Sequence, residues 1–270
     1  TESTKTVGLA NAILAERERP RCDLFWNNEI LNTLRLEQAG LLKSFRPANA
    51  RLYPASAQSP DGLWHGFAAR ARVLLVNTNQ VPETRRPKSI KSLTDPQWYE
   101  RCGIAKPLFG TTATHAACLF ATWNDDEAQE FFRSVKRNAR IMAGNKQVAR
   151  AVSSGALAFG LTDTDDAIIE VEAGHPVAIV YPDQRDGELG TLFIPNTLAL
   201  IAGAPRTAAA EKLVNYLLSA EVEKTLANSA SAQIPLNPQV PATDRVETPQ
   251  SVRAMQIDWD AAADKWDTAR

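Results

Sequence analysis

Short apolar runs and amphipathic segments alternate along most of the chain. The spacing of apolar residues predicts helices over residues 3–19, 30–40, 113–123, 127–137, 146–153 and 207–218. Apolar runs between these segments predict strands over residues 22–26, 68–76, 103–105, 156–161, 177–181 and 192–201. Strands that alternate with helices are typical of α/β proteins, so the sequence predicts an α/β fold.

Three segments depart from this alternation. Pro195 interrupts the last apolar run and predicts either an irregular strand or an edge strand, because proline cannot donate to a β-ladder. Residues 78–97 are rich in Pro, Thr, Arg and Lys, which predicts a loop and a first candidate crossing between domains. From Ala232 onward the tail is rich in Pro and Asp, and we expect weak helices at 249–257 and 259–268.

Composition narrows the class of protein. The 270 residues are enough for one large or two medium domains. The 30 basic and 31 acidic side chains give a net charge of −1, which argues against nucleic-acid binding and against a membrane-surface role. Apolar runs stay shorter than the ~20 residues that span a bilayer. The three cysteines lack metal-site spacing and are interpreted as buried thiols, with a Cys102–Cys118 disulfide as the alternative.

The most informative polar segment is Thr162–Asp166, which directly follows the predicted strand 156–161. Ligands bind at this end of a strand in open α/β sheets. The segment carries three carboxylates, Asp163, Asp165 and Asp166, which repel one another unless a cation, a donor-rich ligand or water lies between them. The alternative interpretation is an acidic turn that caps the next helix.

Two other polar segments also begin where a predicted strand ends. Residues 110–115, Gly-Thr-Thr-Ala-Thr-His, open a helix, and the free N–H groups of a helix start bind anions. Residues 27–29, Asn-Asn-Glu, open another helix and either cap it or reach a ligand, while Trp26 packs under the ligand or fills the core. Ordinary capping by the threonines is the alternative for the first of these segments. Together with 163–166, the two segments predict a common cleft.

Catalytic motifs give a weaker interpretation. The histidines at 65, 115 and 175 are isolated, and we expect His115 on the surface of a first helical turn. The sequence contains neither a nucleophile elbow nor a dinucleotide-binding glycine motif. Asp163 and Asp166 are a candidate carboxylate pair for glycosidic chemistry, but that chemistry needs a defined separation between them.

In their order along the chain, these segments resemble the periplasmic solute-binding proteins of ABC importers. The resemblance is closest to the ferric-iron-binding class of type II, two-lobed binding proteins, and it covers most of residues 1–240. Its segments are residues 22–29, 70–77, 106–115, 155–166 and 190–218. It implies mixed sheets flanked by helices in two lobes. The first lobe is expected to contain residues 1–77 with 189–230, and the second residues 78–188 with 231–270.

The resemblance also implies how such a protein works. A ligand is clamped between the lobes, binding closes the hinge, and the closed form docks on a membrane permease. It implies a periplasmic monomer that binds no nucleic acid, performs no covalent chemistry and needs no cofactor apart from a metal ion carried as ligand. Family members begin with a strand, a helix and a second strand ahead of the segment like residues 1–6. The N-terminal strands of the first lobe, and a signal peptide, are thus expected to be missing from this sequence.

The resemblance assigns a ligand-binding set to this sequence. The set contains Glu2, Ser3 and Thr4 at the border of the cleft, together with Trp26, Asn27, Asn28, Glu29, Thr111, Thr112, Ala113, Thr114, Asp163, Thr164, Asp165 and Asp166. Within it, Asp165, Asp166 and Glu29 are the candidate metal ligands, and residues 110–114 match the place where the iron binders hold an anion.

The sequence departs from the iron binders at two places. Thr164-Asp165-Asp166 stands where they have a pair of tyrosines, and Asn28 aligns with their carboxylate ligand, with Glu29 next to it. Carboxylates suit oxygen-ligated cations such as Ca²⁺ or Mg²⁺, or an amine. We therefore expect a carrier of a metal ion with a bound anion. The alternatives are a carrier of a zwitterion such as an aminophosphonate, and a metal-dependent phosphoester hydrolase.

Overall fold

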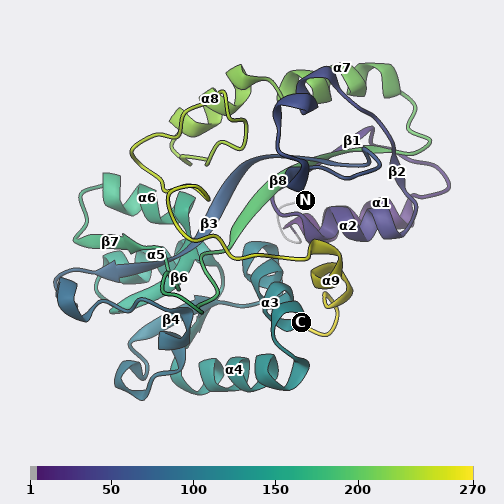
Figure 1. Ribbon diagram of the computed structural model, residues 1–270. Helices are drawn as coiled ribbons and strands as arrows, with labels where there is room; N and C mark the ends of the chain where they lie inside the picture. The colour runs from purple at the N-terminus through teal and green to yellow at the C-terminus, as the bar shows by residue number, and fades with distance from the viewer. Residues whose placement is uncertain (1–4, 270) are drawn as a thin grey trace.

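In a computed structural model, of which residues 5–269 are described, the protein has helices on both faces of a mixed sheet (Figure 1). The strand order is β1-β8-β3-β6-β4-β5, with β2 paired to β8 and β7 paired to β3. The strands are β1 (Leu24–Asn27), β2 (Leu42–Lys43), β3 (His65–Asn77), β4 (Cys102–Ala105), β5 (Arg140–Met142), β6 (Phe159–Asp163), β7 (Val177–Val180) and β8 (Phe193–Ile201). The predicted α/β class with mixed strands and flanking helices is confirmed.

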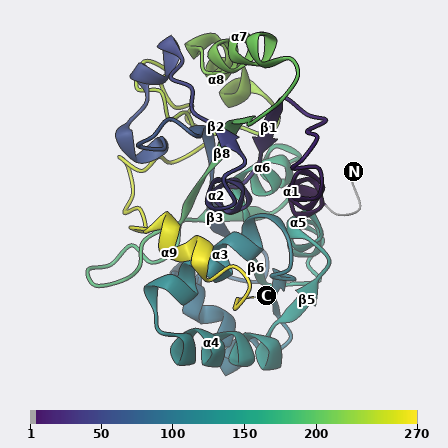
Figure 2. The same ribbon diagram turned by 90° about the vertical axis from the view of Figure 1, so that its right-hand side faces the viewer.

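The helices divide into two groups that surround the two ends of the sheet (Figures 1 and 2). The first group contains α1 (Lys5–Ala15), α2 (Leu31–Gln38), α7 (Thr207–Leu217) and α8 (Ala220–Asn228). The second contains α3 (Gly110–Thr122), α4 (Asp125–Asn138), α5 (Asn145–Ser153) and α6 (Thr164–Glu172). The C-terminal helix is α9 (Trp259–Asp264). In the described part of the chain, no helix has both the length and the apolar character needed to cross a membrane.

Strand β3 joins the two lobes. Its first half, His65–Ala71, runs antiparallel to β8, and its second half pairs with β6 and β7. Val73 and Leu75 pack in the core beside α5 and α6, whereas Leu74 and Val76 belong to the core that includes α3. Such burial on both faces is expected for a strand covered by helices on both sides. Arg72 shares the α3 side of this strand.

Two predicted features of the sheet need correction. Strand β6 ends at Asp163, two residues beyond the predicted run, so Asp163 is the last strand residue rather than the first residue of a turn. Strand β8 pairs with both β1 and β3, so it is not an edge strand as a whole; β1 covers only Thr197–Leu200, however, and at Pro195 itself β8 is paired with β3 alone. The irregular alternative is confirmed, because β3 shifts register between Phe67 and Ala69, the residue opposite Pro195.

Helix α5 lies unusually close to β6 because of one glycine. A Cβ atom added at Gly160 would overlap the side chain of Val148, so only glycine allows this approach. The close packing brings Asn145, the first residue of α5, next to the end of β6. Three helices, α3, α5 and α6, thus begin near Asp163.

The C-terminal tail contacts both lobes. Helix α9 packs against α2 and α3 (Figure 2), and Lys265 pairs with Asp125 at 2.7 Å. Before it, Ile234 forms a bridge with Ala69. The helix predicted at 249–257 is wrong, because this segment forms turns and a bridge. The assignment of the tail to the second lobe, and the expectation of missing N-terminal strands, stay predictions. The three cysteines are free, and Cys102 and Cys118 are buried.

Candidate functional site

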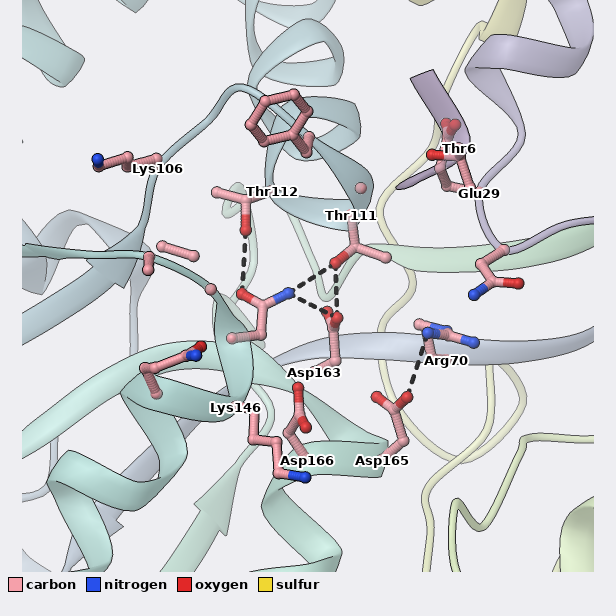
Figure 3. Close-up of a pocket in the computed structure, with 18 of the residues that line it drawn as sticks. Thr6, Glu29, Arg70, Lys106, Thr111, Thr112, Lys146, Asp163, Asp165 and Asp166 are labelled. Carbon is pink, nitrogen blue, oxygen red and sulfur yellow. Dashed lines mark hydrogen bonds and ion pairs between the residues drawn. The ribbon is translucent and has the colours of Figure 1, made fainter. Parts of the chain in front are cut away.

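A cavity of about 600 Å³ lies between the two lobes (Figure 3). One wall comes from α1 and from the segment between β1 and α2, and the opposite wall comes from the N-termini of α3, α5 and α6. Arg70 of β3 lies between the two walls. The lining residues are Thr6, Leu9, Trp26, Asn28, Glu29, Arg70, Ala105, Lys106, Phe109, Gly110, Thr111, Thr112, Ala143, Gly144, Asn145, Lys146, Gln147, Asp163, Asp165 and Asp166.

Asp163 is the centre of a buried network that fixes the second wall. Its Oδ1 pairs with Nη1 of Arg72 at 2.6 Å, and its Oδ2 accepts hydrogen bonds from Thr111 Oγ1 at 2.5 Å and Asn145 Nδ2 at 2.8 Å. Arg72 has no exposed side-chain surface, and its two terminal nitrogens also find acceptors in Thr111, Thr112 and Asn145, while its Nε has no partner among the described residues. Thr112 Oγ1 donates to Asn145 Oδ1 at 3.0 Å. The network joins α3 and α5 to β6.

The starts of α3 and α5 form the anion-attracting side of the cavity. The first N–H groups of a helix have no acceptor inside the helix, and they carry partial positive charge. The residues that precede the two helices are Phe109 and Gly144. Within residues 5–269, neither of them provides a side-chain hydrogen bond that caps the helix. Lys106 and Lys146 line the same side. This side can hold a carboxylate, carbonate or phosphate group.

The first turn of α6 forms an acidic side next to it. Oxygen atoms of Asp163, Asp165 and Asp166 lie within 4.8 Å of one another. Burial, together with repulsion from Asp165 and Asp163, raises the pKa of Asp166 to about 7. Burial also raises the pKa of Asp165, against the opposing charge of Arg70. A cation or a hydrogen-bond donor in the cavity would therefore be stabilised here.

Glu29 has a different role from the one that the sequence suggested. Its Oε2 accepts from Leu31 N and from Thr114 Oγ1, both at 2.9 Å, and its Oε1 accepts from Asn32 Nδ2 at 2.5 Å and Asn27 Nδ2 at 3.3 Å. These bonds hold the start of α2 and connect it to α3 of the other lobe. Among the described residues, Glu29 is not in the acidic group, so the structure does not bring the three candidate metal ligands together.

The structure brings eight of the candidate ligand-binding residues to the cavity wall. They are Trp26, Asn28, Glu29, Thr111, Thr112, Asp163, Asp165 and Asp166. Four others lie outside the lining, namely Asn27, Ala113, Thr114 and Thr164, of which Asn27 and Thr114 are bound to Glu29. Glu2, Ser3 and Thr4 fall outside the described residues.

Sequence reasoning missed the basic residues of the cavity. Arg70 and Arg72 lie within the predicted strand 68–76 and are not among the candidate site residues, and neither is Asn145, which directly precedes the predicted helix 146–153. Two arginines spaced by one residue in an otherwise apolar strand were the available signal, because a guanidinium on a buried strand needs a carboxylate partner. Lys106 and Lys146 carried no such signal, since isolated lysines are common on surfaces.

His115 is buried behind the anion-attracting side, so its predicted surface position is wrong. The side chain lies among apolar residues that include Phe131, Phe132 and Leu161, because α4 covers this face of α3. Burial, with a smaller contribution from the nearby charge of Arg72, lowers the pKa of His115 to about 3.

This lowered pKa predicts a loss of stability in acid. Below its ordinary pKa of about 6.5, the unfolded chain binds a proton at His115 that the folded chain does not bind. The free energy of unfolding should therefore decrease as the pH falls from 6.5 towards 3, by about 2 kcal/mol at pH 5 from this group alone. Urea unfolding of wild type and His115→Leu at pH 7.5 and pH 5 measures the difference. Equal pH dependence of the two proteins would contradict the assignment.

Comparisons with known proteins give a consistent set of relatives. The sequence matches the family described as "Bacterial extracellular solute-binding protein" over residues 27–265. The "Iron uptake protein A2" of Synechocystis sp. is 28% identical over 221 residues, which cover 77% of this chain and 62% of that protein. The "Major ferric iron-binding protein" of Neisseria meningitidis serogroup A is 24% identical over 277 residues, covering 97% of this chain and 80% of that protein.

A solved structure shares the fold. Iron-bound HitA from Pseudomonas aeruginosa matches with a TM-score of 0.89 and 24% sequence identity. The match covers 98% of this chain and 86% of that chain. The two proteins thus share the two-lobed fold.

Proposed function

Because the chain belongs to the family of bacterial extracellular solute-binding proteins, we propose that it captures a metal ion together with an oxyanion for an ABC importer. The observation that carries this proposal is that one cavity has two adjacent sides of opposite charge, one that attracts anions and one that attracts cations. Two uncapped helix starts with Lys106 and Lys146 face the cavity beside the carboxylates of Asp165 and Asp166. A bound metal–anion pair matches both sides at once.

Each side has a defined part in this proposal. The oxyanion lies against the N–H groups at the starts of α3 and α5, and the metal ion lies next to Asp165 and Asp166. Carboxylate oxygens are the ligands that hard cations prefer. The reaction is binding and release, with no covalent step. The iron-uptake and iron-binding relatives support iron as the metal, and the family supports a location outside the cytoplasmic membrane with a permease as partner.

The coordination differs from one based on phenolates. The sequence has tyrosines at 53, 99, 181 and 216, and none of them is among the described residues that line the cavity. The protein therefore offers carboxylate oxygens, and the anion must supply further oxygen ligands to the metal.

Titration calorimetry on ligand-stripped protein tests the proposal. We expect Fe³⁺ with citrate to bind with one site per chain, and citrate alone to bind more weakly. A zwitterion is the second candidate, because the cavity offers lysines and carboxylates side by side. Tight binding of 2-aminoethylphosphonate without binding of the iron complex would favour that candidate. Metal-dependent hydrolysis of a phosphoester, lost on Asp165→Ala, would favour the hydrolase instead.

One prediction concerns the anion side. Lys146→Met should weaken binding of the iron–citrate complex by about tenfold, because it removes a cation next to the helix starts. The matched control is Lys136→Met, since Lys136 is an exposed lysine on α4. Calorimetry of both variants gives the dissociation constants. An unchanged constant for Lys146→Met would place the anion elsewhere in the cavity.

A further inference from the structure

The acidic side of the cavity is already largely neutralised by arginine. Asp163 is paired with Arg72 at 2.6 Å. Asp165 Oδ2 is paired with Arg70 Nη1 at 3.1 Å (Figure 3). Asp166 is the member of this group for which no arginine pair is found among residues 5–269. An uncomplexed trivalent ion would meet three carboxylates and two guanidinium groups at the same place, which is poor compensation for the loss of its water shell.

Arg70 is held in position by the fold. Its side chain is 12% exposed, and its Nη2 donates to Asn196 Oδ1 and to Gln233 Oε1, both at 3.3 Å. Asn196 belongs to β8, and Gln233 belongs to the segment that bridges to β3. The guanidinium is therefore bound to β8, to the segment around Gln233 and, through Asp165, to α6. These contacts keep it in the cavity when a second cation arrives.

The rest of the cavity is suited to an organic body. Its volume of about 600 Å³ is much larger than a single ion needs. Trp26 and Phe109, which line it from opposite lobes, are 41% and 38% exposed, and Leu9, which also lines the cavity, is exposed as well. Apolar side chains at a cavity wall contribute to binding through contact with carbon, which a bare metal ion does not have.

We propose that Arg70 is a specificity-determining residue that excludes the uncomplexed metal ion and admits the metal only as a preformed complex with an organic oxyanion. The proposal rests on the proposed function, because it concerns the form in which the metal enters the same cavity. The organic anion reduces the charge that Arg70 meets, fills the remaining coordination positions of the metal, and places its own oxygens at the starts of α3 and α5. Asp166 then contacts the metal, while Arg70 stays bound to Asp165.

Terbium binding tests this selection. Tb³⁺ is a soluble trivalent ion that prefers oxygen ligands, and its luminescence can be excited through Trp26 at the cavity wall. Wild type, Arg70→Gln and the charge-retaining Arg70→Lys are each titrated at pH 6.5 with Tb³⁺ alone and with Tb³⁺–citrate. We expect wild type and Arg70→Lys to bind Tb³⁺–citrate at least tenfold more tightly than Tb³⁺ alone. Arg70→Gln should bind Tb³⁺ alone at least tenfold more tightly than wild type does.

The outcomes separate this proposal from the function itself. Equal affinity of wild type for Tb³⁺ and Tb³⁺–citrate would overturn the selection while leaving a metal carrier, and this comparison needs no variant. An unchanged affinity of folded Arg70→Gln for Tb³⁺ would remove Arg70 from that role, with circular dichroism to establish folding. Failure of wild type to bind either terbium species would reject the proposed function together with this inference.

Discussion

Replacement of Asp165 and Asp166 together by asparagine should weaken binding of the iron–citrate complex by about a hundredfold or more, equivalent to about 2.8 kcal/mol. The two side chains share the first turn of α6 and line the cavity. Replacement by asparagine removes the negative charge of each side chain with little change in its volume. Asparagine oxygens are weaker ligands for hard cations than carboxylates are. Calorimetry of the double variant gives the dissociation constant.

A matched control changes the same charges elsewhere. Asp126→Asn with Glu127→Gln removes two negative charges from the first turn of α4, where both side chains are exposed. This control should bind the complex as wild type does. If the Asp165 and Asp166 variant keeps the wild-type dissociation constant, these residues are not part of the metal site, and the proposed division of the cavity is wrong.

Arg72→Met should lower the free energy of unfolding by about 3–5 kcal/mol, which is the cost of leaving a buried charge without its partner. Arg72 is fully buried, and it donates to Asp163, Asn145 and the hydroxyl groups at the start of α3. Methionine has a similar length but no donor, so the carboxylate of Asp163 is left in the protein interior. Urea unfolding at neutral pH measures the loss.

Two further variants test whether the charge itself causes this loss. Adding Asp163→Asn to Arg72→Met should restore part of the lost stability, because the unpaired charge is then removed. Arg137→Met breaks the exposed pair with Glu130, at 2.8 Å, and should cost less than about 1 kcal/mol. Equal losses for Arg72→Met and Arg137→Met would show that the network around Asp163 contributes no more than a surface ion pair.

Local sequence signals were sufficient for the framework of the site. Polar residues directly after apolar runs marked the start of α2, α3 and α6, and the fold places all three starts at one cavity. This works because β1 runs in the opposite direction to β4 and β6, so the carboxyl ends of these strands approach the same cavity from the two lobes. The α/β class followed from the same alternation of strands and helices.

Long-range pairing set the parts that the sequence did not predict. Arg72 meets Asp163 because β3 and β6 run antiparallel with these two residues in register, 91 positions apart in the chain. Nothing in the local pattern of either strand specifies that register. Glu29 likewise accepts a hydrogen bond from Thr114 of the other lobe. The sequence predicts Glu29 as a metal ligand, and it does not indicate that the fold occupies its carboxylate with this bond.

The position of α9 limits how the two halves of the protein can move. Beside the strands that cross between the lobes, α9 rests on α2 in one lobe and on α3 in the other. A rotation that opens the cavity would separate these two helices, and α9 would then keep only one of them as a neighbour. The loss of one of these two contacts makes opening of the cavity less favourable. Amide hydrogen exchange along residues 259–264 would report the fraction of open molecules.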